Sequence, residues 1–176
     1  LLTLRKVVDN GETSATHVAS EWTLSASGPT QLEDVATGTV SQVKIGDYTL
    51  SESGPAGYTA SAWDCGDASV VDGVVSIALG DDVTCTVTNT AIAPTLTLNK
   101  SVINGDTGAA FTSADWSLSA SGPTSITHVV TGTKSTVKVG DYTLSELGPD
   151  GYTASAWDCG DAKVTNNVVH VGVGQD

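Results

Sequence analysis

The chain has 176 residues and a formal net charge of −13, from seven Lys and Arg against twenty Asp and Glu. This charge disfavours binding to nucleic-acid phosphate or to an anionic membrane surface. With 39% hydrophobic and 15% charged residues, the composition is too apolar for a disordered acidic chain. No run approaches the roughly 18 apolar residues of a membrane helix, so we expect a folded segment without membrane insertion.

Alternating hydrophobic residues predict a series of short strands, and no stretch has a sustained helical period. In chain order, the inward-facing sets are Leu2, Leu4, Lys6 and Val8; Trp22, Leu24 and Ala26; Tyr48, Leu50 and Glu52; Val75, Ile77 and Leu79; and Cys85, Val87 and Asn89. Turn-forming pairs such as Asn10-Gly11 and Gly54-Pro55 separate these runs. The spacing predicts roughly seven strands in an immunoglobulin-like or prealbumin-like antiparallel sandwich.

This pattern occurs twice in the chain. WDCGDA at Trp63–Ala68 recurs at Trp157–Ala162, and GDYTLSE at Gly46–Glu52 recurs at Gly140–Glu146, always 94 residues later. The repeat predicts two tandem all-β domains, residues 1–91 and 92–176, joined by a short linker that favours a rod-like tandem.

The second copy stops early. Its last residues align with residues 80–82, so we expect the second sandwich to lack its last strand within this chain. That strand is either cut off or supplied by another molecule. Because the chain contains no Met, we interpret it as an internal part of a larger protein.

Three polar residues occupy positions where the alternation predicts the core. Lys6, Glu52 and Asn89 each follow an inward apolar residue by two positions, whereas Lys44 has the outward parity. Burial lowers the pKa of an amine and raises that of an acid, so both neutral forms become available together. Next to a carboxamide, such a pair can form a Lys–Asn isopeptide bond with loss of ammonia. The residues also allow a partly exposed Lys6–Glu52 ion pair worth about 0–1 kcal/mol, with Asn89 in a turn.

Three segments carry a resemblance to a known family. LTLRKVVDNG at Leu2–Gly11, GDYTLSESGPAGY at Gly46–Tyr58 and TCTVTNTA at Thr84–Ala91 resemble the collagen-adhesin B-type and pilin-like repeats of Gram-positive surface proteins, also called prealbumin-like domains. The resemblance extends over both copies.

In that family, a Lys of the first strand, a Glu of the second motif and an Asn or Asp of the last strand form a spontaneous isopeptide bond. The resemblance implies a bond between Lys6 and Asn89, promoted by Glu52 as the catalytic acid. In the second copy it implies the same roles for Lys100 and Glu146, without an acceptor in this chain.

The three cysteines suggest one disulfide. Cys85 has the inward parity, and a bond from Cys65 to Cys85 closes a loop of about 20 residues, worth roughly 3 kcal/mol. Two buried free thiols are the alternative. Cys159 aligns with Cys65, and we expect it to be unpaired in this chain. Paired cysteines indicate an oxidising, extracytoplasmic setting.

The remaining signals are weak. The acidic pairs lack calcium-loop spacing, His17, His128 and His170 are expected at the surface, and no Cys or His cluster predicts zinc, so we expect no metal and no cofactor. Trp63 and Trp157 are interpreted as core residues beside the disulfide rather than as sugar-stacking groups. No serine lies in a nucleophile motif, and we expect no enzyme.

The sequence therefore favours a structural role. We expect a stalk segment of a bacterial adhesin or fibre, extracellular and at the cell surface, whose partners are neighbouring repeats and a possible donated strand. The alternative is a sandwich that itself binds a carbohydrate or a host ligand, and an exposed aromatic cluster would favour it.

Overall fold

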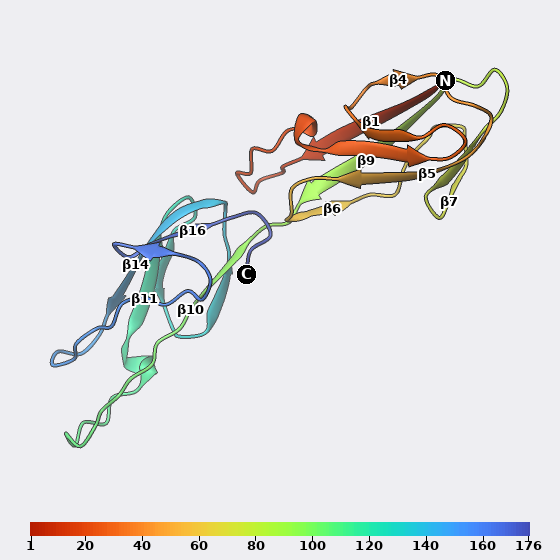
Figure 1. Cartoon of the computed structure of the whole chain (residues 1–176). Coiled ribbons are helices and arrows are strands. Elements are labelled where there is room, and N and C mark those ends of the chain that lie inside the picture. The colour runs from red at the N-terminus through yellow and green to blue at the C-terminus, as the bar shows by residue number, and fades with distance from the viewer. The chain divides into compact units, whose positions relative to one another are not determined.

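The computed structural model describes residues 1–176, which divide into two compact units. The first comprises Leu1–Gly11 and Thr16–Ile92, and the second comprises Ala93–Asp176 together with Glu12–Ala15. Apart from two short 3-10 helices, η1 (Ala19–Glu21) and η2 (Ser113–Asp115), the regular structure is β, which confirms the predicted class (Figure 1). No helix has the length and apolar character required to span a bilayer.

The first unit is a sandwich of two sheets. One has the strand order β4-β1-β9-β6, with bounds Val40–Ser41, Leu2–Asp9, Val83–Ala91 and Tyr58–Ala60. The other has the order β3-β2-β5-β8-β7, with bounds Leu32–Val35, Thr23–Ser27, Gly46–Ser53, Val74–Ile77 and Val70–Val71. Five of these nine strands match the alternating runs, whereas β3, β4, β6 and β7 fall outside them, because strands of two to four residues offer little alternation to detect.

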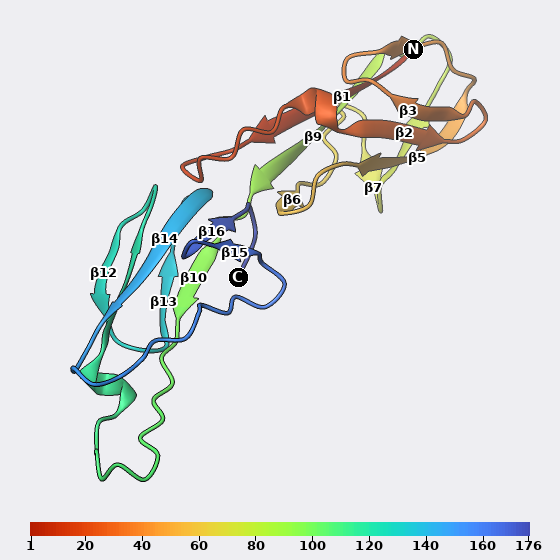
Figure 2. The same ribbon diagram turned by 60° about the vertical axis from the view of Figure 1, so that its left-hand side comes forward.

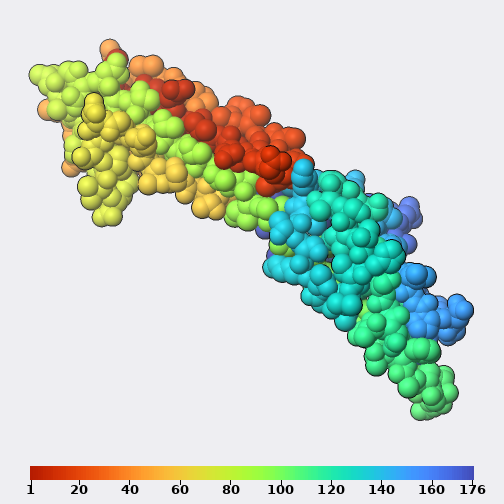
Figure 3. Space-filling model, turned by 180° about the vertical axis from the view of Figure 1, so that it is seen from behind, coloured from red at the N-terminus to blue at the C-terminus, as the bar shows by residue number.

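The first and last strands of this unit lie side by side. β1 and β9 pair in parallel over eight residues, from Leu2 opposite Val83 to Asp9 opposite Thr90, whereas every other strand pair is antiparallel. Figure 3 shows the N-terminal residues, in red, next to the yellow-green residues of the β9 region. This pairing brings side chains from the two ends of the unit into one core.

The core of the first unit follows the predicted alternation. Leu4, Leu24, Tyr48, Val75 and Val87 are buried between the sheets, and Lys44 is exposed as its parity predicts. The expectation for Leu79 was wrong, since its side chain is 92% exposed. β8 ends at Ile77, and a turn follows in which the Ala78 N–H donates to the carboxylate of Asp81.

The second unit contains a five-stranded sheet that corresponds to the β3-β2-β5-β8-β7 sheet of the first unit. Its five strands have the order β12-β11-β14-β16-β15, with bounds Ile126–Val129, Ser117–Ser121, Gly140–Leu147, Val168–Val171 and Val164–Thr165. A separate two-stranded sheet joins β10 (Thr95–Leu98) to β13 (Thr133–Thr136). As expected, no strand corresponds to β9.

The segments that flank β9 in the first unit are less ordered into strands in the second. β10 has four residues where β1 has eight, and residues 152–154, which correspond to β6, form no strand. Figure 2 shows the chain after β14 running as a long loop, in blue, toward β15. Both differences have one cause. In the first unit, β9 forms hydrogen bonds with β1 on one side and with β6 on the other, and the second unit has no such strand in this chain.

Candidate cross-linking site

Lys6 and Glu52 meet inside the first sandwich. β1 and β5 belong to opposite sheets, and the Lys6 Nζ donates a hydrogen bond to Oε2 of Glu52 across the space between them. The Lys6 side chain is fully buried and that of Glu52 is 15% exposed, so this is not a solvent-exposed ion pair. Burial lowers the pKa of Lys6 below 10.5, although the hydrogen bond and charge of Glu52 act in the opposite direction. The amine is therefore more often neutral than an exposed lysine.

The lysine amine also lies against an aromatic stack. Its Nζ is 5.2 Å from the ring centroid of Trp22, whose ring meets Tyr58 edge-on at 5.1 Å. Gly54 makes this arrangement possible, because a Cβ at that position would lie 2.3 Å from Cδ1 of Trp22. The sequence reasoning missed Trp22 and Tyr58 as site residues. The signal was present, since both residue types recur 94 positions later.

A similar turn holds the far end of the stack in both units. The Tyr58 hydroxyl donates to Oδ1 of Asn10 at 2.6 Å, and Nδ2 of Asn10 donates to the carbonyl of His17 at 2.9 Å. His17 was expected at the surface, but it is half-buried and its ring lies 5.6 Å from that of Tyr58. Phe111 occupies the same place in the second unit, so both units place a ring against the tyrosine at this position.

Asn89 lies in β9 rather than in a turn, and it is 5% exposed. Its Oδ1 is buried without a hydrogen-bond partner, which typically costs about 1–3 kcal/mol. The β1–β9 register places Val87 opposite Lys6 and Asn89 opposite Val8. With strands about 4.8 Å apart and roughly 6.6 Å spanned by two residues, the Cα atoms of Lys6 and Asn89 are roughly 8 Å apart. A lysine side chain can reach across that distance.

The second unit contains the same lysine–glutamate pair without the asparagine. The Lys100 Nζ donates to both carboxylate oxygens of Glu146, at 2.9 and 2.7 Å, and lies 5.1 Å from the Trp116 ring centroid. The Lys100 and Glu146 side chains are 15% and 22% exposed, more than those of the first unit. Both line a cavity of about 450 Å³, together with Ala154 and Trp157.

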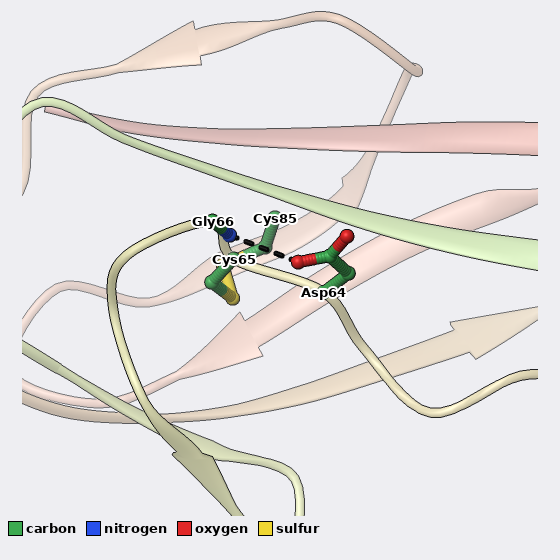
Figure 4. The surroundings of a disulfide bond; sticks show 4 residues. All are labelled: Asp64, Cys65, Gly66 and Cys85. Atoms are coloured by element: carbon green, nitrogen blue, oxygen red, sulfur yellow. Dashed lines mark hydrogen bonds between the residues drawn. A yellow bond between two sulfur atoms is a disulfide. The ribbon is translucent and has the colours of Figure 1, made fainter.

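The predicted disulfide is confirmed. Cys65 and Cys85 are bonded, so that the loop before β7 is tied to β9 (Figure 4). The adjoining turn is fixed by the Gly66 N–H, which donates to Oδ1 of Asp64 at 3.0 Å. Cys159 is free and half-buried, and burial, with a smaller effect of the nearby Asp158 charge, raises the pKa of its thiol.

The other residues considered from the sequence lie apart from this site. Trp63 and Trp157 are partly buried and pack against the two cores, as expected. His128 and His170 are exposed, and His170 pairs with Asp141 at 2.7 Å. No group of three or more His, Cys, Asp or Glu side chains is close enough together to hold a metal ion.

Comparison with protein families gives one result. A family model described as a prealbumin-like fold domain matches the chain twice, at residues 1–87 and 92–176. No curated protein and no solved structure gives a match.

Proposed function

Because the chain belongs to the family of prealbumin-like fold domains, with two copies in tandem, we propose that it is a stalk segment of a bacterial cell-surface adhesin or fibre. The observation that carries this proposal is the buried lysine–glutamate pair, which recurs with its tryptophan in both units. A stalk needs stable repeated domains, and two similar neighbouring domains meet that need. The packing of Trp63 and Trp157 against the cores favours this role over sugar binding.

We propose that an isopeptide bond between Lys6 and Asn89 stabilises the first unit. The neutral Lys6 Nζ attacks Cγ of Asn89, a new C–N bond forms, and the carboxamide nitrogen leaves as ammonia. Glu52 takes the proton from the attacking amine and passes it to the leaving nitrogen. Two features support this reaction: the lowered pKa of Lys6, and the buried Oδ1 of Asn89, which has no partner. A bond that forms once within its own chain is not enzymatic turnover.

Intact mass spectrometry tests this proposal. After reduction of the disulfide, the protein should be about 17 Da lighter than its sequence, because one ammonia is lost. Glu52→Ala should restore the full mass, since the proton carrier between the reacting groups is gone. The matched control is Lys44→Ala, which removes an exposed lysine and should leave the loss of about 17 Da unchanged. A reduced wild-type protein of unmodified mass would overturn the proposal.

We also propose that a β9-type strand from another molecule completes the second unit. Such a strand would lie beside β10 and cover the cavity that Lys100 and Glu146 line. Sheet edges bind extended segments through main-chain hydrogen bonds, and the first unit supplies the template, with β9 between β1 and β6. Its asparagine would then provide the acyl group that Lys100 lacks.

A synthetic peptide copying Asp82–Thr90, with Cys85→Ser, tests strand binding without disulfide chemistry. We expect it to bind the whole chain in calorimetry and, with time, to form an adduct lighter by about 17 Da than the sum of the two masses. Lys100→Ala should abolish the adduct while leaving binding intact, whereas Lys138→Ala, which changes a lysine of the same unit that does not line this cavity, should affect neither. Failure of the peptide to bind would reject strand donation.

A further inference from the structure

Each unit has an Asn–Gly pair in the turn before its 3-10 helix, Asn10-Gly11 in the first and Asn104-Gly105 in the second. The two glycines are exposed, with φ of +50° and +56°. An asparagine followed by glycine is prone to lose its side-chain ammonia, because the glycine nitrogen has no neighbouring side chain to hinder its attack on the carboxamide. The sequence makes both turns candidates for this reaction, and their contacts distinguish them.

The two asparagine side chains are held in the same way. Oδ1 of Asn104 accepts a hydrogen bond from the Tyr152 hydroxyl at 2.6 Å, and its Nδ2 donates to the carbonyl of Phe111 at 3.0 Å. The equivalent distances at Asn10 are 2.6 and 2.9 Å. These bonds restrain the carboxamide and slow its reaction equally in both units. A difference in rate must therefore come from the attacking nitrogen.

The attacking nitrogens have different neighbours. The Gly11 N–H donates to Oδ1 of Asp9 at 2.9 Å. Ile103 stands in place of Asp9 in the second unit, with a side chain that is 86% exposed and contains no acceptor, and the Gly105 N–H donates no hydrogen bond. The nitrogen must lose its proton before it attacks, and a carboxylate beside it opposes the negative charge that develops. Gly105 is therefore the better nucleophile.

A further contact supports reaction at Gly105. The Thr107 hydroxyl donates to the carbonyl of Asn104 at 2.6 Å. This carbonyl and the Gly105 nitrogen belong to one peptide group, so the hydrogen bond stabilises the negative charge that the group carries after losing its proton. The space beside Gly105 is open, since a Cβ at this position would have no atom within 4 Å. A base from solvent can reach the N–H.

We propose that Asn104 is a site of spontaneous deamidation and that Asp9 protects the equivalent Asn10. A base removes the Gly105 N–H proton, and the nitrogen attacks Cγ of Asn104. A C–N bond closes a five-membered imide, and the carboxamide nitrogen takes up a proton and leaves as ammonia. Water then opens the imide. Cleavage of the new C–N bond gives aspartate, and cleavage of the original backbone C–N bond gives isoaspartate.

Both products lose the donor that holds Phe111. Aspartate directs a carboxylate, which only accepts hydrogen bonds, toward the Phe111 carbonyl, and isoaspartate adds a CH₂ group to the backbone of the turn. The Phe111 ring lies 6.0 Å from that of Tyr152 and 6.5 Å from that of Trp116, which in turn faces Lys100. The modification therefore loosens the aromatic stack beside this lysine.

Ageing of the whole chain at mildly alkaline pH in ¹⁸O-labelled water tests the proposal. Each deamidation replaces an amide by a carboxylate with one ¹⁸O atom, an increase of about 3 Da that peptide mapping by mass spectrometry assigns to a residue. An unopened imide is lighter by about 17 Da, and mapping separates it from an isopeptide because it lies within one peptide. Asn99, Asn166 and Asn167, which do not precede glycine, are internal controls and should not change.

Asn104 should convert at least about tenfold faster than Asn10 in the folded chain. Asp9→Ile should accelerate Asn10, and Ile103→Asp should slow Asn104, each by about tenfold. Both side chains are exposed, so these variants should fold. In denaturant the two rates should approach each other, because the hydrogen bond from Gly11 to Asp9 is lost. Equal rates in the folded wild-type chain, including no conversion at either site, or rates that the two substitutions leave unchanged, would overturn the proposal.

Discussion

At the scale of single residues, the first unit buries a lysine whose amine is subject to three different effects. Glu52 accepts its hydrogen bond, the Trp22 ring faces its charge, and burial favours the neutral form. Alternation along the strands predicted the inward positions of Lys6, Glu52 and Asn89. It could not predict the contact of Trp22 with the lysine amine or the unpartnered Oδ1 of Asn89, because these depend on how the two sheets face each other.

The pH dependence of bond formation follows from the lowered pKa of Lys6. Only the neutral amine attacks, and in the folded unit its fraction grows as pH rises toward this pKa, which lies below 10.5. The rate should therefore rise from acidic to alkaline pH and level off before the pH at which an exposed lysine would titrate. The measurement is the loss of about 17 Da with time after refolding at a series of pH values. A rate that is independent of pH would contradict a neutral amine nucleophile.

At the scale of elements, the site depends on close packing between β2, β5 and β6. The ring of Trp22 occupies the space beside Gly54, at the end of β5, and contacts Tyr58 of β6. The second unit repeats this contact, because a Cβ on Gly148 would lie 2.2 Å from Nε1 of Trp116. Neither glycine has a positive φ that would explain its presence, so the aromatic ring is the reason for it.

Gly54→Ala should move the Trp22 ring and destabilise the first unit by about 1–3 kcal/mol, the usual cost of overpacking. Denaturant unfolding measures the change, with the exposed Ser53→Ala as the matched control. Combining Gly54→Ala with Trp22→Ala identifies the cause, since the alanine should cost little once the ring is gone. An equal cost with and without Trp22 would show that packing against this ring is not the reason for the glycine.

The extent to which the strands could be predicted also has a physical explanation. Long alternating runs indicated β1, β5 and β9, whereas β4 exists only because β1 offers it an edge. Leu79 continues the alternation of β8 but is exposed, because the Ala78 N–H donates a hydrogen bond to the Asp81 carboxylate and the strand ends before Leu79. In both cases, contacts outside the local pattern decide the outcome.

At the scale of the whole molecule, the two units allow two related sequences to be compared, one with and one without a last strand in this chain. LTLRKVVD at Leu2–Asp9 is one continuous strand beside β9, whereas LTLNKSVI at residues 96–103 is a strand only as far as Leu98. The strand propensity of the segment is therefore realised only where a neighbour supplies hydrogen bonds. The 94-residue repeat predicted this incomplete sandwich, but it could not predict how far β10 and residues 152–154 would lose their pairing.

The parallel pairing of β1 and β9 also determines how the first unit carries tension. The chain enters at the Leu2 end of β1 and leaves at the Ala91 end of β9, at opposite ends of the paired region. A pull on the two termini of the unit therefore slides these strands past each other and loads all their hydrogen bonds together. In an antiparallel pair, the start of one strand and the end of the other would lie at the same end. The same pull would then break the hydrogen bonds one after another, under a smaller force.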